Sequence, residues 1–331
     1  MRKTGRPTMI DVAADAGVSL KTVSRVVNGE SGVDPAMIER VRASVARLGY
    51  HRNSLAASLR SGNRDTIGFI AADLSNTFYM AVAAAVSQVA TRERMHVVMA
   101  SSEEDADLER TLALDMCQRQ VGGLIVVPTA ADHSYLAREV ELGTPVVFLD
   151  RPGSGIPADA ILLDNRGGAR DAVAELLAAG HRRIAVLLDA PSIYTMAERR
   201  EGVRDAFAAA GRALDPALVV EGLHTPADAR DAMERLLDSA DPPTAVFGTN
   251  NRLTIGALET ILPRGADVAI AGFDDFELSR LLPRRIRLVD YDVADLGARA
   301  TETLLARGAD PATGSHTQLV PTRLVDRGGV R

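Results

Sequence analysis

The segment Met9–Val27 combines residue types and spacings that are suited to reading DNA. A helix-turn-helix needs a small residue where its helices cross, a glycine in the turn, and buried apolar residues at fixed spacings. Ala13 and Gly17 meet the first two needs. The alternative is an ordinary helical hairpin with no role in DNA binding. The apolar positions that favour the motif are Val12, Ala16, Val18, Val23 and Val26.

The second helix of this motif would enter the major groove of DNA by its N-terminal end. The guanidinium of Arg25 could pair with a guanine, and its alternative is a phosphate contact without sequence specificity. The side chains placed to reach base edges are Leu20, Lys21 and Arg25, and those placed to reach phosphates are Ser19, Thr22 and Ser24.

Carboxylate, amide, arginine and aromatic side chains recur at the ends of predicted strands in the rest of the chain. Ligands of parallel α/β sheets bind beyond the carboxyl ends of the strands. Such side chains can form paired hydrogen bonds to the hydroxyls of a ligand, and an aromatic ring can pack against its apolar face. The candidates for such a site are Asp73, Asn76, Phe78, Asp150, Arg199, Asn250 and Asp274, with Tyr291 at a crossover between sheets.

Two of these candidates have a purely structural alternative. Asp274 lies beside Asp275 and could simply cap a helix, and Arg199 lies beside Arg200 and could form a solvated pair of cations. These alternatives stay open from the sequence alone.

Helix signals in residues 8–48 predict a compact three-helix unit that would present the reading helix. Residues 53–60 could add about two helical turns, which are marginal in isolation, before Ser61–Gly62–Asn63 breaks the pattern. The helix signals are a Thr8–Asp11 capping pair, Gly17 as the first stop, Ser19 as the second cap, and Asp34–Pro35 opening a third helix that ends near Gly49.

From Thr66 onward, strands alternate with amphipathic helices, which predicts parallel sheets built from right-handed βαβ units. More than 250 residues of this pattern are too many for one small sheet, so two lobes are expected. The predicted strands are 66–72, 96–100, 123–127, 145–149, 160–163, 184–188, 244–248, 268–272 and 287–290.

Composition and charge exclude several classes of protein. The 331 residues are 46% hydrophobic, and residues 1–64 hold 11 Lys and Arg against 5 Asp and Glu, a balance of +6 that leaves −12 on the rest. The single cysteine, Cys117, excludes an internal disulfide and a cysteine-based zinc site, and indicates a reducing cytoplasm. Neither an export signal nor an apolar run long enough to cross a membrane is found.

Motifs of catalysis and cofactor binding are also missing from the sequence. Residues 153–158 match G-x-G-x-x-A, but Pro157 and the apolar run that follows indicate a loop entering a strand, not a turn opening a helix. The histidines are dispersed, and neither a phosphate-binding P-loop nor a nucleophile elbow is present. The sequence therefore predicts no cofactor, no catalytic residue and no metal site.

The order of these features resembles the LacI/GalR type of transcriptional regulator, over roughly residues 7–327. The resemblance is carried by the run Thr8–Ser19 followed by Thr22–Asn28, and by landmarks in the same order along the chain. They are Leu48–Gly49–Tyr50, Asn53–Leu59, Thr66–Gly68, Asp73–Asn76, Gly122–Ile125, Leu149–Arg151, Gly180–Ile184, Arg199–Gly202, Gly272–Asp275 and Leu324–Arg327.

The resemblance implies a small all-α helix-turn-helix head and an α/β two-lobed effector domain like that of periplasmic sugar-binding proteins. The expected divisions are 1–52 for the head, 53–64 for a hinge helix and linker, and 65–327 for effector binding and dimerisation. Lobe 1 would comprise about 65–160 and 291–320, and lobe 2 about 161–290 and 321–327. No C-terminal heptad repeat is found, so tetramerisation through a coiled coil is not expected.

The resemblance also assigns roles to further residues. Leu59 lies where the family inserts a leucine into the minor groove, which bends the DNA, and Asn53 and Ala56 lie on the same short helix; a plain interdomain linker is the alternative. Thr8 and Asn28 join the expected DNA contacts. His224 matches a position where some relatives place a stacking aromatic, although a lone histidine is more often structural.

The expected function is a homodimeric repressor that binds a pseudo-palindromic operator in double-stranded DNA. A small-molecule effector, with a carbohydrate as first candidate, would bind between the lobes and change their angle. Thr77 in place of a family proline and Asn251 in place of a family aspartate leave the effector class open. The alternatives are a purine or other corepressor, or a sugar-binding or sugar-metabolising protein with an accessory head.

Overall fold

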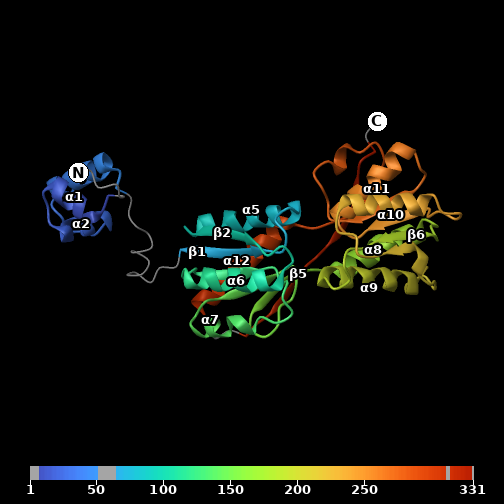
Figure 1. Ribbon diagram of the computed structural model, residues 1–331, viewed down its shortest axis with the longest axis horizontal. Helices are drawn as coiled ribbons and strands as arrows, with labels where there is room; N and C mark the ends of the chain where they lie inside the picture. Colours follow the sequence, from blue (N-terminus) through green and yellow to red (C-terminus); the bar gives the residue numbers. More distant parts are fainter. Residues whose placement is uncertain (1–6, 51–64, 311–313, 330–331) are drawn as a thin grey trace. The chain divides into compact units, whose positions relative to one another are not determined.

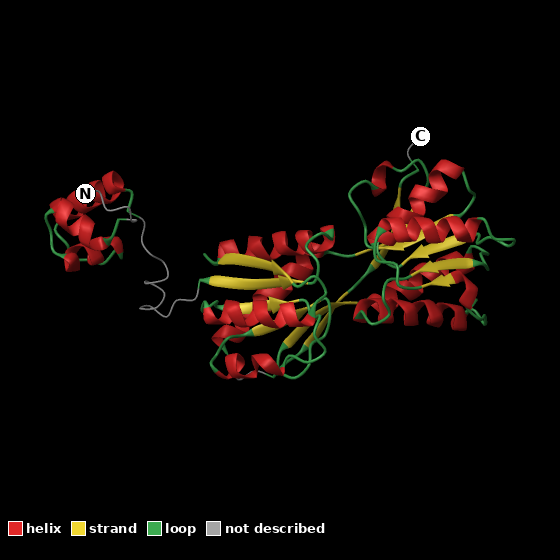
Figure 2. Cartoon of the chain, in the orientation of Figure 1, coloured by secondary structure: helices red, strands yellow, loops and turns green. Residues whose placement is uncertain are grey.

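The computed structural model describes residues 7–50, 65–310 and 314–329. The chain forms two compact units, residues 1–64 and 65–331, which are the head and the body. Figure 1 labels their elements, and Figure 2 shows an all-helical head and a body of strands covered by helices. Asn53, Ala56 and Leu59 of the expected hinge lie outside the described residues.

The head contains three helices, as the capping signals predicted. They are α1 (Met9–Ala16), α2 (Leu20–Val27) and α3 (Pro35–Leu48). Thr8 and Asp11 form the predicted capping box of α1, and Gly17 ends this helix with φ +62°, a left-handed conformation that favours glycine. Ser19 caps α2 and Asp34 caps α3. The buried side chains that hold the unit together are those of Val12, Ala16, Val23, Val41 and Tyr50.

Polar contacts from α3 fix the turn between α1 and α2. The Arg40 guanidinium donates to the backbone oxygen of Ala16 at 2.6 Å, so it satisfies a carbonyl at the C-terminal end of α1. Asp15 accepts from Ser44 at 2.6 Å and also pairs with Arg47. The position of α2 therefore depends on residues of α3 that are distant in sequence.

The first sheet of the body has the strand order β11-β5-β4-β3-β1-β2, and all its pairs are parallel. Strand residues alternate between the two faces, so Phe69 packs with α5 and α12 while Ile70 packs with α6. The strands are β1 (Thr66–Ala71), β2 (His96–Ser101), β3 (Gly123–Val126), β4 (Val146–Leu149), β5 (Asp159–Leu163) and β11 (Thr317–Val320), and the main helices are α5 (Thr77–Arg92), α6 (Ala106–Gln118) and α12 (Val293–Ala309).

The second sheet has the order β12-β10-β9-β8-β6-β7, in which only the pairing of β12 with β10 is antiparallel among the described residues. Helices α8 and α9 cover one face, and α10 and α11 cover the other. The strands are β6 (Ile184–Leu187), β7 (Val219–Val220), β8 (Ala245–Gly248), β9 (Ala269–Phe273), β10 (Ile286–Asp290) and β12 (Arg323–Arg327), and the helices are α8 (Asn165–Ala178), α9 (Tyr194–Ala209), α10 (Pro226–Leu237) and α11 (Asn251–Arg264).

All nine predicted strands are present within a residue or two of their expected limits. The sequence pattern missed β7, β11 and β12, which are edge strands that are short or partly exposed. The chain first crosses between the sheets after β5, so the expected division near residue 160 falls inside this strand. Short helical segments complete the body: Ser134–Leu136, Ala137–Glu141, Pro216–Leu218 and Ser279–Leu281.

Candidate DNA-reading face and effector cleft

One face of the head presents α2 to solvent around a shallow groove. Leu20 is 46% exposed on this face. Lys21 is also exposed, and Arg25 is partly exposed. The residues that line the groove are Met9, Leu20, Lys21, Ser24, Arg25 and Glu30. The structure therefore brings together the three residues that the sequence placed at base edges.

The other predicted DNA contacts of the head take part in helix capping. The backbone N–H of Thr22 donates to the Ser19 hydroxyl at 3.1 Å, and the two hydroxyls lie 2.9 Å apart. The Thr8 hydroxyl donates to Asp11 at 2.6 Å. Asn28 follows the last turn of α2, and its amide nitrogen lies 3.4 Å from the Ser24 hydroxyl. Their DNA contacts remain predictions.

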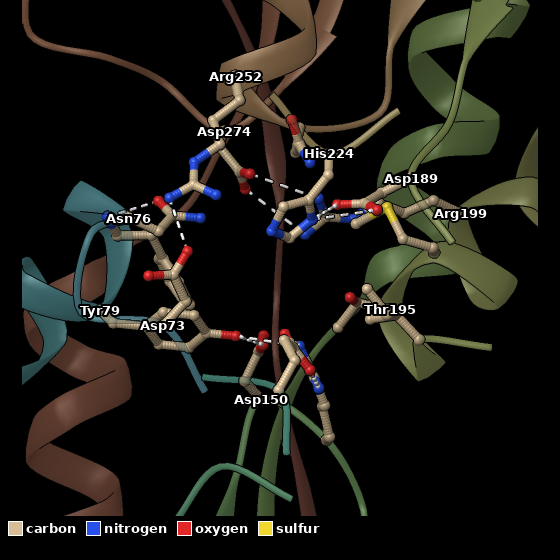
Figure 3. Close-up of a pocket in the computed structure, with 16 residues that line it drawn as sticks. Asp73, Asn76, Tyr79, Asp150, Asp189, Thr195, Arg199, His224, Arg252 and Asp274 are labelled. Carbon is tan, nitrogen blue, oxygen red and sulfur yellow. Dashed lines mark hydrogen bonds and ion pairs between the residues drawn. The ribbon is translucent and has the colours of Figure 1, made fainter. Parts of the chain in front are cut away.

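The body contains a cleft between its two sheets, at the carboxyl ends of several parallel strands (Figure 3). The cleft takes residues from both lobes. Its lining includes all but one of the predicted effector residues, namely Asp73, Asn76, Phe78, Asp150, Arg199, His224, Asn250 and Asp274.

Arg199 and Asp274 form a buried pair on the lobe 2 side of the cleft. The Arg199 guanidinium lies 3.4 Å from the carboxylate of Asp274, donates to the backbone oxygen of Thr249 at 2.6 Å, and stacks 3.6 Å from the centre of the Phe273 ring. Neither residue of the pair is more than 6% exposed. This burial rules out the solvated-pair alternative for Arg199. The helix-cap alternative for Asp274 is wrong because the helical turn that follows it, Ser279–Leu281, has Leu278 at its N-cap.

Tyr291 reaches the cleft only through Asp274. Its hydroxyl donates to the Asp274 carboxylate at 2.8 Å, and its ring lies outside the lining of the cleft. Burial and the charge of Asp274 raise the pKa of Tyr291, so the hydroxyl stays protonated and remains a donor. Tyr291 therefore supports Asp274 in this structure, and its direct contact with an effector stays a prediction.

Asp150 lies at the lobe 1 side, directly after β4. Its carboxylate is 4% exposed and accepts from the Tyr79 hydroxyl at 3.2 Å, the only side-chain donor to it among the described residues. Burial raises the pKa of Asp150, and the charges of Arg151 and Arg199 only partly offset this effect. Asp150 and Asp274 both have positive φ, +66° and +70°, a strained state for a residue with a side chain.

Asp150→Asn is expected to raise the free energy of unfolding at pH 7, because the amide removes a buried carboxylate whose charged form is disfavoured by burial. A carboxyl whose pKa is raised by folding stabilises the folded state only while it is protonated. That stability is lost as the pH rises through the folded-state pKa. Denaturant unfolding of both proteins between pH 4 and pH 8 should show a gain that grows with pH. A gain that is absent at every pH would contradict the raised pKa.

Arg151 carries a second buried ion pair beside Asp150. Its guanidinium makes two hydrogen bonds to Glu104, at 2.6 and 2.7 Å, and donates to the backbone oxygen of Pro128 at 3.2 Å. Although burial opposes it, the neighbouring Tyr79, Glu104 and Asp150 raise the pKa of Arg151, so it stays charged. The positive charge of Arg151 is therefore paired with a carboxylate of the protein itself, that of Glu104.

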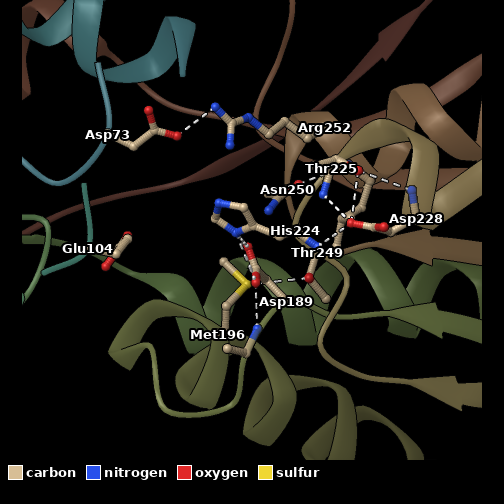
Figure 4. Close-up of polar contacts among 12 residues, drawn as sticks. Asp73, Glu104, Asp189, Met196, His224, Thr225, Asp228, Thr249, Asn250 and Arg252 are labelled. Carbon is tan, nitrogen blue, oxygen red and sulfur yellow. Dashed lines mark hydrogen bonds and ion pairs between the residues drawn. The ribbon is translucent and has the colours of Figure 1, made fainter. Parts of the chain in front are cut away.

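His224 stands at the mouth of the cleft on lobe 2 (Figure 4). Its Nδ1 lies 3.2 Å from a carboxylate oxygen of Asp189, and about half of its side chain is exposed. Asn250 lies behind it and caps α11, because its amide oxygen accepts from Leu253 N–H at 2.9 Å. Asn76 caps α5 in the same way through Phe78 N–H at 3.1 Å. Capping orients both amides toward the cleft.

Polar contacts between the lobes close one side of the cleft (Figures 3 and 4). The Arg252 guanidinium donates to the Asp73 carboxylate and to the Ser75 hydroxyl, both at 2.7 Å. Ser75 in turn donates to Asp73 at 2.7 Å, so both carboxylate oxygens of Asp73 accept a hydrogen bond within this set. Ser75 and Arg252 lower the pKa of Asp73, although its burial opposes them. We call Asp73, Ser75 and Arg252 the interlobe clasp.

Two family models match this chain. Residues 8–53 match the model for bacterial regulatory proteins of the lacI family, and residues 64–279 match the model for periplasmic binding proteins and the sugar-binding domain of the LacI family. The second match alone covers more than half of the chain. The chain belongs to the LacI family. It is therefore a DNA-binding transcriptional regulator.

Relatives of this LacI-family regulator match it over nearly its whole length. Catabolite control protein A of Priestia megaterium is 31% identical, covering 90% of this chain and 91% of its own. The lac repressor dimer bound to operator and the anti-inducer ONPF is 27% identical with TM-score 0.84, covering 99% and 100%. A complex of the transcriptional regulator CelR with cellobiose is 28% identical with TM-score 0.71, covering 98% and 100%.

The cleft of this LacI-family regulator also contains residues that the sequence analysis did not select. Two of them, Glu104 and Asp189, follow predicted strands and could have been found by the same strand-end argument. Arg252 gave no signal, because its partner lies 179 residues away. The full set is Tyr79, Glu104, Arg151, Asp189, Ile193, Thr195, Met196 and Arg252.

Two further findings concern the described residues as a whole. They contain no group of three or more His, Cys, Asp or Glu side chains arranged to hold a metal ion. None of their helices has both the length and the apolar character needed to cross a membrane.

Proposed function

We propose that this regulator is a homodimeric cytoplasmic repressor whose affinity for a pseudo-palindromic operator changes when an unphosphorylated sugar binds between its lobes. The observation that carries the effector assignment is the cleft itself, where carboxylates and amides from both lobes converge beside the ring of Phe78. Such groups pair with vicinal hydroxyls, while an aromatic ring accepts the C–H face of a sugar.

The charges of the cleft favour an uncharged effector. Among the described residues that line it are five carboxylates and three guanidinium groups. Each guanidinium already faces a carboxylate of the protein, Arg151 with Glu104, Arg199 with Asp274 and Arg252 with Asp73. An anionic ligand would meet excess negative charge and no unpaired cation. The Asp150 carboxylate accepts a hydrogen bond from the Tyr79 hydroxyl and is suited to accept further hydrogen bonds from a pair of ligand hydroxyls.

The similar CelR is named in its complex with cellobiose, which supports a sugar as the effector class. The departure at Asn251 does not weaken this proposal. The Asn251 amide nitrogen lies 3.4 Å from both Asn76 Oδ1 and Thr77 Oγ1, so it faces the other lobe rather than a ligand. Removal of a carboxylate at this position therefore leaves the inner polar groups of the cleft unchanged.

Exposed apolar side chains on both lobes support assembly as a homodimer. Met80 on α5 and Val98 and Met99 on the edge strand β2 are 44–49% exposed, and Leu278 and Leu281 are 64% and 71% exposed. A groove lined largely by apolar side chains runs from α5 to α11 and the loop 274–282. An exposed edge strand and apolar patches of this kind mark protein interfaces, and the similar lac repressor is named as a dimer.

The interlobe clasp couples effector binding to closure of the two lobes. Arg252 lies at the second position of α11, where the helix dipole disfavours a cation. Its partner Asp73 comes from lobe 1, so the charge of Arg252 is compensated only when the lobes are close. Effector binding between the lobes and formation of the clasp therefore favour the same closed arrangement.

Arg252→Gln is expected to weaken effector binding by about 5- to 30-fold, which corresponds to about 1–2 kcal/mol of lost closure free energy. Ligand-free protein should also give a larger radius of gyration in X-ray scattering. The matched control is Arg264→Gln, which removes a pair with Asp238 at 2.6 Å within lobe 2. If the two variants have the same effector affinity and the same radius of gyration, the clasp has no role in closure of the lobes.

Selection of genomic DNA fragments by the full-length protein at two salt concentrations tests the proposed function. Phosphate contacts weaken steeply with salt, so the high-salt pool isolates specific sites. An enriched inverted repeat is expected. The selected operator is then titrated with neutral sugars and with their phosphates. Release by a neutral sugar supports the proposal, tightening by a ligand supports the corepressor alternative, and release only by a phosphate contradicts the charge argument.

A further inference from the structure

The groove on the reading face of the head contains an acidic side chain, which needs an explanation. Glu30 is the only carboxylate among the described residues that line it, beside Lys21 and Arg25. The Glu30 side chain forms an ion pair with Arg25 and is 52% exposed. DNA is a polyanion, so a carboxylate on this face repels phosphates and opposes binding. A residue with this cost is expected to have a compensating role.

The contacts of Glu30 point to Arg25. The Glu30 carboxylate lies 3.4 Å from Arg25 Nε, and the Glu30 backbone N–H donates to the Arg25 backbone oxygen at 2.9 Å. The amide nitrogen of Asn28 lies 3.5 Å from the same carboxylate. The end of α2 and the loop that follows it are therefore joined through Glu30.

A second contact holds the same guanidinium from the loop. Arg25 Nη2 donates to the backbone oxygen of Ser31 at 2.5 Å. Gly32 has φ +84°, and a Cβ atom there would lie 3.2 Å from Arg25 Nη2. The loop Glu30–Gly32 thus contacts one edge of the Arg25 guanidinium, the edge formed by Nε and Nη2.

The other edge of the guanidinium stays available. Nε faces Glu30 and one N–H of Nη2 faces Ser31, while Nη1 has no protein partner among the described residues. Nη1 and the second N–H of Nη2 form the pair of donors that fits O6 and N7 of guanine. Holding the long side chain in advance also lowers the conformational entropy that is lost on binding.

We infer that Glu30 is a positioning residue that holds Arg25 in the orientation needed to read a guanine, and that it makes no attractive contact with DNA itself. The inference rests on the proposed reading role of Arg25. It predicts a specific signature: Glu30 improves the discrimination between bases while lowering the affinity for DNA of any sequence. A simple masking role predicts the opposite effect on discrimination.

The test compares the selected operator with the same fragment in which the guanine read by Arg25 is replaced. That position is the one at which Arg25→Ala stops discriminating. Fluorescence anisotropy of the full-length protein measures both affinities at one salt concentration. Glu30→Gln is expected to reduce discrimination by about two- to fivefold, the range expected for an exposed ion pair, and to raise affinity for the replaced fragment. Glu30→Asp is expected to retain most of the discrimination.

Two controls separate positioning from general charge effects. Glu39→Gln makes the same change of charge on the exposed side of α3, and it is expected to leave discrimination unchanged. Glu30→Gln in the Arg25→Ala background is expected to have no further effect on discrimination. Equal gains of affinity on both fragments, or a rise in discrimination, would overturn the inference and indicate repulsion or masking.

The outcome also separates this inference from the proposed function. If Arg25→Ala still discriminates at every operator position, the reading role of Arg25 fails, and the role of Glu30 fails with it. If Arg25→Ala loses discrimination and Glu30→Gln does not, only the role of Glu30 is overturned.

Discussion

Arg25→Ala is expected to lower the affinity of the full-length protein for its operator by about 5- to 150-fold at each half-site, the value of one bidentate contact to a base. Affinity for unrelated DNA should fall much less. The reason is that Arg25 lies on the exposed face of α2 with one edge of its guanidinium free, while the rest of the head packs without it. Anisotropy titrations with the operator and with a scrambled duplex measure both affinities.

Arg42→Ala is the matched control, because Arg42 is an exposed cation on α3 and the change of charge is the same. It should weaken operator and scrambled DNA by similar factors. If Arg25→Ala also weakens both duplexes equally, Arg25 contacts phosphate rather than a base, and the alternative left open by the sequence is correct.

Arg199→Met is expected to abolish release from the operator by the effector and to lower the free energy of unfolding by about 3–5 kcal/mol, the usual cost of breaking a buried ion pair. The substitution leaves the Asp274 carboxylate buried, with the Tyr291 hydroxyl as its remaining donor among the described residues. It also removes a stacking partner from the Phe273 ring and a donor from the Thr249 carbonyl. Operator binding without effector should persist where the protein is folded, because the head forms a separate unit.

A second variant keeps this prediction testable if the first one unfolds. In Arg199→Met/Asp274→Asn the unpaired charge is removed, so most of the lost stability should return, as measured by denaturant unfolding. The effector response should stay absent, because the paired donors and acceptors for hydroxyls are gone. If the double variant releases the operator at the same effector concentration as the wild type, Arg199 and Asp274 do not take part in effector binding.

The helices of the head could be predicted almost completely because their signals are local. A cap and its partner lie within three residues, as for Thr8 with Asp11, and the stops at Gly17 and Gly49 need only a left-handed residue. Eight of the nine predicted strands are largely buried apolar runs, which keep their pattern whatever their neighbours are, and the ninth, β2, is an apolar edge strand that is partly exposed. Strands β11 and β12 escaped prediction because they are half-exposed and exist only through pairing with β5 and β10.

The strand-end argument found most of the cleft for a similar reason. Parallel strands bring their carboxyl ends to one edge, so the residues after each strand converge even when they are far apart in sequence. Asp73, Asp150, Asn250 and Asp274 could be found in this way. The role of each residue could not, since the position of a residue does not tell which other side chain it meets.

The tertiary structure alone decided these pairings. It set Arg252 against Asp73, 179 residues away, turned the Tyr291 hydroxyl onto Asp274, and placed Glu104 on Arg151. The sequence by itself determined a helix-turn-helix head, two α/β lobes and the edge where a ligand binds, because hydrophobic period and helix caps act over a few residues. Which charges neutralise each other, and so which ligand the cleft accepts, depends on distances of a few ångströms between segments that only the packed lobes bring together.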